Sequence, residues 1–233
     1  MNYNPWPLGK LKPKHQRQEP HRIKGLGYKW NDPREIVDMF EKKVSEYFGA
    51  KYGVAVDCCT NAIFLCLQYL KSKNGLPYRI YIPKHTYISV PMQVLHCGVK
   101  VTFIPEKWEG CYRLVPSRII DAAVIWERNA YVPESLMCLS FQIKKAIPIG
   151  RGGMILTDDK DEYEWLKLAS HDGRNLDTPY DSEGHIKMLG WNMYMSPEDA
   201  ARGLLLMNDI GDKGKYMGWK NYPDVSQMLK GII

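Results

Sequence analysis

The sequence contains no apolar run near the roughly 20 residues that a membrane-spanning helix needs, and its first residues lack the apolar stretch of a secretory signal. Its six cysteines form no Cys-x-x-Cys pair, and no spacing of cysteine or histidine indicates a metal site. The composition, with 45% hydrophobic and 25% charged residues, excludes a disordered or low-complexity chain. We therefore expect a globular cytoplasmic protein with reduced thiols, no metal and no membrane contact.

The excess of positive charge is confined to one end of the chain. The formal net charge is +6, and residues 1–35 hold eight basic and three acidic residues, a net +5. The remaining 198 residues therefore carry only +1. A nearly neutral body offers no basic face for a phosphate backbone, so we do not expect nucleic-acid binding, except through the basic N-terminal segment.

Three segments are predicted from the distribution of residue types. Residues 1–31 combine four prolines with aromatic and basic residues, which predicts an arm without regular elements that wraps around the body. Residues 32–210 show the hydrophobic periodicities of an α/β domain. Residues 211–233 are left as a short C-terminal tail.

The body is predicted to begin with a helix and then to alternate strands and helices. Asp32, Pro33 and Glu35 fit an N-cap, a first-turn proline and a capping-box acid, and Gly49 ends that helix. The expected helices are 36–48, 60–70, 86–97, 159–171 and 196–210, and the expected strands are 52–56, 78–82, 99–104, 119–126, 136–141 and 153–156. This order favours an α/β fold with a mostly parallel sheet.

Ligands of such sheets lie beyond the carboxyl ends of the strands, where helix N-termini also point. The residues that follow the expected strands are 57–61, 83–87, Asp121 and 140–145. They include hydroxyls, lysines and one acid in an apolar strand, so this edge is the predicted site.

Six segments in a fixed order resemble the fold-type I aminotransferases that use pyridoxal phosphate (PLP), and within them the DegT/DnrJ/EryC1/StrS family. They are FEKKVSEYFGAKYGVAVDCCTNAI, IYIPKHTYISVPMQVLHCGVKVTFI, IIDAA, CLSFQIKKAIPIGRGGMILTDD, LASHDGRN and LGWNMYMSPEDAARGLLLMNDI. The resemblance implies a three-layer PLP-transferase-like large domain, PLP as cofactor, a nucleotide-linked keto-sugar as substrate, and glutamate as amino donor.

A lysine is needed to hold PLP as a Schiff base and to move a proton between substrate and cofactor. In the family this lysine lies five residues after a serine in an S-F-x-x-x-K segment. Counting from Ser140 gives Lys145, and Lys144 is the alternative one residue away. Without the resemblance, both would be interpreted as surface lysines.

A carboxylate has to keep the pyridine nitrogen of PLP protonated, and Asp121 resembles the family's aspartate at a strand end. An acid between isoleucines and alanines is costly to bury unless it is paired, which favours the same role. The alternative is that residues 117–126 form a helix with Asp121 on its solvent-exposed face.

The remaining site residues also follow from the resemblance. Thr60 and Asn61 match the turn that holds the cofactor phosphate, and Ser140 matches its hydroxyl partner. Tyr87 matches the aromatic residue that stacks on the pyridine ring, and Asn192 matches an asparagine that reaches the phosphate from the other subunit, which implies a homodimer. Otherwise Thr60 would be a plain helix cap and Tyr87 a buried tyrosine.

The sequence also departs from the family pattern. Cys59 replaces a glycine of the phosphate turn, Val124 replaces a polar residue near the cofactor ring, and Tyr194 replaces an arginine. Only sixteen residues separate Ile104 from Asp121, where the family has another strand–helix unit, and 23 residues after Ile210 stand in place of the C-terminal domain, which is largely absent.

These features lead to one hypothesis and two alternatives. The first is a PLP-dependent aminotransferase acting on a nucleotide-linked keto-sugar. The second is a degenerate, non-catalytic PLP-fold protein that binds a sugar nucleotide or a protein partner. The third is binding of nucleic acid or an anionic surface through the arm, which could also meet the phosphates of a nucleotide-sugar.

Overall fold

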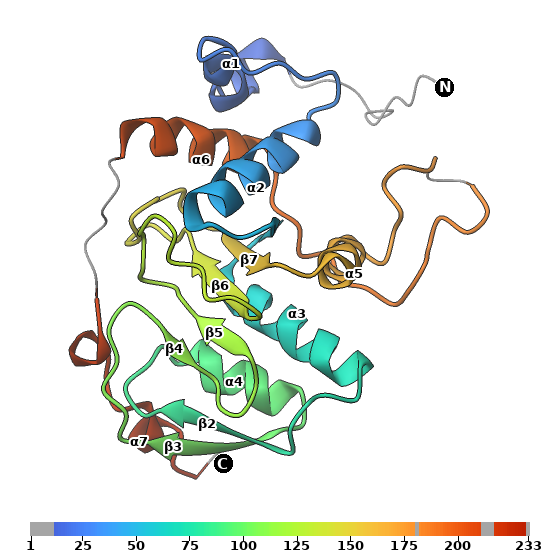
Figure 1. Ribbon diagram of the computed structural model, residues 1–233. Coiled ribbons are helices and arrows are strands. Elements are labelled where there is room, and N and C mark those ends of the chain that lie inside the picture. Colours follow the sequence, from blue (N-terminus) through green and yellow to red (C-terminus); the bar gives the residue numbers. More distant parts are fainter. Residues whose placement is uncertain (1–11, 180–181, 211–216, 232–233) are drawn as a thin grey trace.

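The computed structural model describes residues 12–179, 182–210 and 217–231, and Figure 1 shows their arrangement. The helices are α1 (Glu19–Lys24), α2 (Glu35–Phe48), α3 (Cys59–Ser72), α4 (Ser89–His96), α5 (Lys160–Ser170), α6 (Pro197–Asp209) and α7 (Val225–Met228), with 3-10 turns at Pro13–His15 and Trp219–Asn221. The strands are β1 (Tyr52–Val56), β2 (Arg79–Pro83), β3 (Lys100–Ile104), β4 (Tyr112–Arg113), β5 (Ile119–Asp121), β6 (Leu136–Ser140) and β7 (Gly153–Thr157).

The strands form one five-stranded sheet, in the order β1-β7-β6-β5-β4, and a parallel pair, β2 and β3. Strands β1, β5 and β6 run in the same direction, whereas β7 and β4 run antiparallel to their neighbours. The α/β fold is confirmed, but the sheet is mixed where we expected mostly parallel strands. The reason is that β6–β7 and β4–β5 are joined by loops without a crossover helix, and such a connection returns the chain antiparallel.

Helices cover both faces of the five-stranded sheet, which gives the three layers expected (Figure 1). The apolar strand β6 shows why: Leu136 and Cys138 belong to the core beneath α3 and α4, whereas Met137 and Leu139 belong to the core beneath α2 and α6. Because alternate side chains of a strand point to opposite faces, a continuous apolar strand is buried on both sides.

Most element boundaries lie within a few residues of those predicted, and the exceptions concern the pocket described below. Helix α4 begins at Ser89 rather than 86, which leaves Thr86 and Tyr87 in a loop. Strand β5 ends at Asp121 rather than 126, and the N–H of Ala123 donates to the Asp121 carboxylate at 3.0 Å in the turn that follows. The Ser196 cap of α6 is confirmed, since its hydroxyl accepts from the N–H of Asp199 at 3.1 Å.

The prediction that residues 1–31 hold no regular element was wrong for their described part. Helix α1 forms with Pro20 in its first turn, where a missing N–H costs nothing, and its Ile23 is fully buried near α6. Arg17 pairs with Asp199 of α6 at 2.6 Å. Residues 1–11 lie outside the described part of the chain. Within it, no helix is both long and apolar enough to cross a membrane.

Candidate active site

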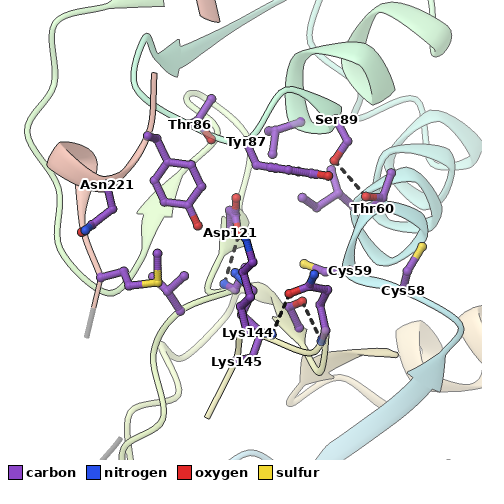
Figure 2. Close-up of a pocket in the computed structure, with 18 of the residues that line it drawn as sticks. Cys58, Cys59, Thr60, Thr86, Tyr87, Ser89, Asp121, Lys144, Lys145 and Asn221 are labelled. Carbon is purple, nitrogen blue, oxygen red and sulfur yellow. Dashed lines mark hydrogen bonds between the residues drawn. The ribbon is translucent and has the colours of Figure 1, made fainter. Parts of the chain in front are cut away.

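A cavity of about 690 Å³ opens where segments far apart in the sequence meet, and Figure 2 shows its lining. Because β1, β5 and β6 run in the same direction, the residues after them reach one edge of the sheet. Six of the seven predicted site residues line this cavity: Thr60, Asn61, Tyr87, Asp121, Ser140 and Lys145. The cavity thus lies at the edge that the sequence predicted.

Asp121 is a buried acid held by two donors. Its side chain is 6% exposed, the Tyr112 hydroxyl donates to Oδ2 at 2.6 Å, and the Ala123 N–H donates to Oδ1. Burial raises the pKa of Asp121, while the Tyr112 hydrogen bond, the Ala123 N–H and the charge of Lys145 oppose that rise. The helical alternative for residues 117–126 was wrong, since Asp121 ends strand β5.

The two adjacent lysines occupy different environments. Lys145 is partly buried, and burial lowers its pKa, while the charge of Asp121 acts in the opposite direction. Lys144 is exposed, and its backbone N–H donates to Oε1 of Gln142 at 2.8 Å. Both line the cavity, but Lys145 is the more buried of the two, and its charge also opposes the rise in the pKa of Asp121.

Hydroxyl groups gather at the N-terminus of α3, on the right-hand side of Figure 2. Oγ1 of Thr60 lies 2.8 Å from Oγ of Ser89, and Ser140 lines the same cavity from the end of β6. Nδ2 of Asn61 donates to Oδ1 of Asp57 at 2.7 Å, and Arg151 pairs with the other oxygen of Asp57 at 3.0 Å. Hydroxyls, a helix N-terminus and a nearby guanidinium are groups that bind a phosphate.

The replacement of a family glycine by Cys59 costs this turn nothing. Cys58 is extended, with φ −167°, and Cys59 is already the first residue of α3, so neither needs a left-handed conformation. A glycine is needed instead at Gly153 of β7, where the strand backbone packs directly against this turn. A Cβ atom there would lie only 2.5 Å from the carbonyl carbon of Cys58 and from the nitrogen of Cys59.

Tyr87 is 59% exposed and extends into the cavity (Figure 2). The alternative of an ordinary buried tyrosine was therefore wrong. Its ring is available to a planar ligand, which agrees with the stacking role predicted from the resemblance.

Val124 also lines the cavity, so the wall there is apolar as its residue type predicted.

Sequence reasoning missed Tyr112, which holds the acid at the base of the cavity. It lies in β4, within the short segment between Ile104 and Asp121, and pairs antiparallel with β5 directly opposite Asp121. Its hydroxyl also contacts the hydroxyl of Thr86. No local pattern marks this tyrosine, because its partner is fixed by the register of β4 on β5.

Replacing Tyr112 by phenylalanine should destabilise the PLP-free protein by about 1–3 kcal/mol, because a buried carboxylate loses a donor. Urea unfolding monitored by circular dichroism measures this change. Tyr78→Phe, which removes the hydroxyl of a tyrosine that is 70% exposed, is the matched control and should change the unfolding free energy little. Equal stability of the two variants would show that the Tyr112 hydrogen bond contributes nothing.

Asn192 is the one predicted site residue outside the cavity. Its Nδ2 donates to Oδ2 of Asp172 at 3.0 Å, and its backbone forms a bridge with His171. The ring of Tyr194, which replaces the family's arginine, stacks on His171 with centroids 5.0 Å apart. The role of Asn192 in a second subunit stays a prediction.

Burial of His171 makes stability depend on pH. Burial and the charge of Lys167 lower the pKa of His171 from 6.5 to about 4. Since the unfolded chain binds a proton below pH 6.5 and the folded protein does so only near pH 4, the stability from neutral His171 is present above pH 6.5 and is lost as the pH falls. The loss is about 3 kcal/mol at most.

Urea unfolding of the wild type and of His171→Gln at several pH values tests this expectation. The unfolding free energy of the wild type should fall more steeply between pH 6.5 and pH 4, since the carboxylates titrate equally in both proteins. Parallel curves would contradict it.

The sequence and the fold were compared with those of known proteins. Residues 24–133 and 123–213 match the DegT/DnrJ/EryC1/StrS aminotransferase family. The spore coat polysaccharide biosynthesis protein SpsC of Bacillus subtilis (strain 168) is 24% identical over 257 residues, covering 88% of this chain and 65% of that protein.

Among solved structures, AtS13 from Actinomadura melliaura has a TM-score of 0.66 at 16% identity, covering 82% of this chain and 64% of its own. The aminotransferase PseC of Helicobacter pylori, involved in the biosynthesis of pseudoaminic acid, has a TM-score of 0.65 at 16% identity, covering 86% and 64%. The chain thus spans less than two thirds of the length of these relatives.

The fold and the cavity at its sheet edge define a three-layer α/β protein with the large-domain architecture of sugar aminotransferases. The chain belongs to the DegT/DnrJ/EryC1/StrS aminotransferase family.

Proposed function

We propose that this chain is a PLP-dependent aminotransferase that transfers an amino group from glutamate to a keto-sugar carried on a nucleotide. One observation carries the proposal: the partly buried amine of Lys145 shares a cavity with the buried carboxylate of Asp121, and phosphate-binding hydroxyls line its other end. Family membership supports the reaction class. DesI, a solved protein of the same fold, was crystallised with its TDP-sugar product, and Spr1654 of Streptococcus pneumoniae is known in a PLP form.

The residues present fit the cofactor. PLP, when bound, supplies an electron sink for the carbon that gains or loses the amino group. Asp121 would hold the proton on the pyridine nitrogen, and the hydrogen bonds from Tyr112 and Ala123 favour its ionised form and oppose the rise in pKa that burial causes. Tyr87 would cover the ring face. Thr60, Asn61 and Ser140, together with the N-terminus of α3, would hold the phosphate.

Lys145 would bind the cofactor aldehyde and then move the proton. A neutral amine is the nucleophile, and the lowered pKa of Lys145 raises its neutral fraction at a given pH. The charge of the Asp121 carboxylate opposes that lowering. The Lys145 side chain can therefore accept a proton from the substrate carbon and return it.

A homodimer and a cytoplasmic location belong to the same proposal. Asn192 lies outside the cavity of its own chain, which agrees with a contribution to the site of a second copy. The six cysteines are free thiols, which suits a reducing compartment.

The described part of the N-terminal segment, residues 12–31, lines no part of the cavity, so contact with substrate phosphates is not expected from it.

The experiment is a single turnover without sugar. Protein loaded with PLP is mixed with glutamate, and 2-oxoglutarate is quantified; we expect about one molecule per bound cofactor. Aspartate and alanine serve as comparison donors. Protein that binds PLP but releases no 2-oxo acid from any donor would contradict the proposal and favour the non-catalytic binding protein.

A further inference from the structure

The segment that carries Tyr222 is fixed to the rest of the domain on both sides of that residue. Three residues before it, the N–H of Trp219 donates to the carbonyl of Trp108 at 3.0 Å. Three residues after it, the N–H of Val225 donates to the carbonyl of Lys84 at 2.8 Å. Tyr222 itself is half-buried and lines the cavity. Its backbone position at the cavity wall is therefore set by hydrogen bonds to the body of the domain.

A row of packed aromatic rings connects the Tyr222 side chain with the buried acid. The ring of Tyr222 packs on that of Trp108, with centroids 5.5 Å apart, and Trp108 packs on Tyr112, with centroids 4.8 Å apart. Nε1 of Trp108 donates to the carbonyl of His85 at 2.8 Å, which fixes the middle ring of the row. The Tyr112 hydroxyl in turn donates to Asp121. Tyr222 is therefore two ring contacts away from the residue that holds Asp121.

The Tyr222 hydroxyl is an unused donor on the cavity side of its ring. The charges that act on it are those of Asp121, Cys59 and Tyr87, and all three of these residues line the cavity. Burial and these charges raise the pKa of Tyr222 to about 12, so the hydroxyl is protonated at neutral pH. No residue in the described part of the chain accepts a hydrogen bond from it, whereas a buried tyrosine hydroxyl usually has a partner. The hydroxyl can therefore donate to a ligand in the cavity.

PLP carries a fourth polar group, its ring hydroxyl, besides the pyridine nitrogen, the aldehyde and the phosphate. Asp121 would hold the nitrogen and Lys145 the aldehyde carbon. The ring hydroxyl lies on the edge between these two atoms, so a protein donor for it has to lie near both residues. Val124 lines the cavity but offers no donor, and the Tyr112 hydroxyl already donates to Asp121. The donor therefore has to come from another residue of the lining.

Tyr222 meets this requirement. The charges of Asp121 and Cys59 act on the Tyr222 hydroxyl and on the Lys145 amine alike, so both groups lie beside the same pair of residues. The ring oxygen of PLP is a phenol oxygen, and a hydrogen bond from a protonated hydroxyl stabilises such an oxygen most when it is ionised. A half-buried phenol without a partner in the protein is suited to this role.

We propose that Tyr222 is a cofactor-binding residue whose hydroxyl donates a hydrogen bond to the ring oxygen of PLP. This inference rests on the proposed function, because it assumes that PLP occupies this cavity. The family match ends at residue 213, so the contact belongs to a segment beyond the matched residues. The segment around Tyr222 is thereby part of the cofactor site.

The test measures by calorimetry how tightly the full chain, freed of PLP, binds two cofactor analogues. Pyridoxine phosphate has the ring hydroxyl and the phosphate but no aldehyde, so it binds without a covalent bond to Lys145. The second analogue is the same compound without the ring hydroxyl. The wild type should bind pyridoxine phosphate about tenfold more tightly than the second analogue, the usual effect of one ligand hydrogen bond. Tyr222→Phe, which keeps the ring on Trp108, should lose that preference.

Tyr78→Phe, at a tyrosine that is 70% exposed and does not line the cavity, is the control and should keep the preference. Melting curves establish that Tyr222→Phe folds like the wild type. An unchanged preference in Tyr222→Phe, an equal loss of affinity for both analogues, or no preference in the wild type would each overturn the contact while the proposed function stands. A wild type that binds neither analogue would overturn both. An intact preference without PLP labelling of Lys145 would overturn the proposed function alone.

Discussion

Asp121→Asn should reduce the rate of amino-group transfer about 10³-fold while the protein still folds and binds PLP. Asparagine keeps the shape of the side chain, its oxygen can accept from the Ala123 N–H, and its amide can donate to the Tyr112 oxygen. It cannot hold a proton on the pyridine nitrogen by charge. The expected loss lies within the range for removing a group that positions a proton. Formation of 2-oxoglutarate, with PLP affinity measured in parallel, gives the result.

The matched control is Asp158→Asn, which also removes one carboxylate but at a residue that does not line the cavity. That variant should react like the wild type. A rate for Asp121→Asn within threefold of the wild type would mean that the buried acid is structural. A loss of the cooperative melting transition together with activity would mean that Asp121 is needed for the fold, and would contradict its assignment as a residue that acts on the cofactor.

Lys145→Ala should abolish turnover, with a loss of at least about 10³-fold, because no other group would form the covalent bond to the cofactor and move the proton. Lys144→Ala is the matched control, since it removes the neighbouring amine, which is exposed. It should retain most of the activity and the yellow colour of bound PLP, both of which Lys145→Ala loses. The reverse pattern would shift the reactive lysine by one residue.

The sequence predicted the site where local pattern and strand direction agree. Asp121 and Ser140 each end a strand, and Thr60 lies in the first turn of the helix that follows β1. Parallel strands bring such positions to one edge whatever their separation in the chain. The continuous apolar run of β6 similarly indicates two covered faces, and hence three layers.

What the sequence could not predict depends on contacts between distant residues. Tyr112 reaches Asp121 through the register of β4 on β5, and the C-terminal segment reaches the cavity through backbone bonds to Lys84 and Trp108. Neither pairing leaves a local signal. Helix α1 was missed because its proline was interpreted as a breaker, although a proline in the first turn is compatible with a helix.

The central claim is that Lys145 is the amine that binds PLP. The direct measurement is reduction of the PLP-loaded protein with a hydride reagent, followed by proteolysis and mass spectrometry of the peptide containing residues 140–151. The account predicts one phosphopyridoxyl group per chain, on Lys145. A label on Lys144, or no labelled lysine, would contradict it.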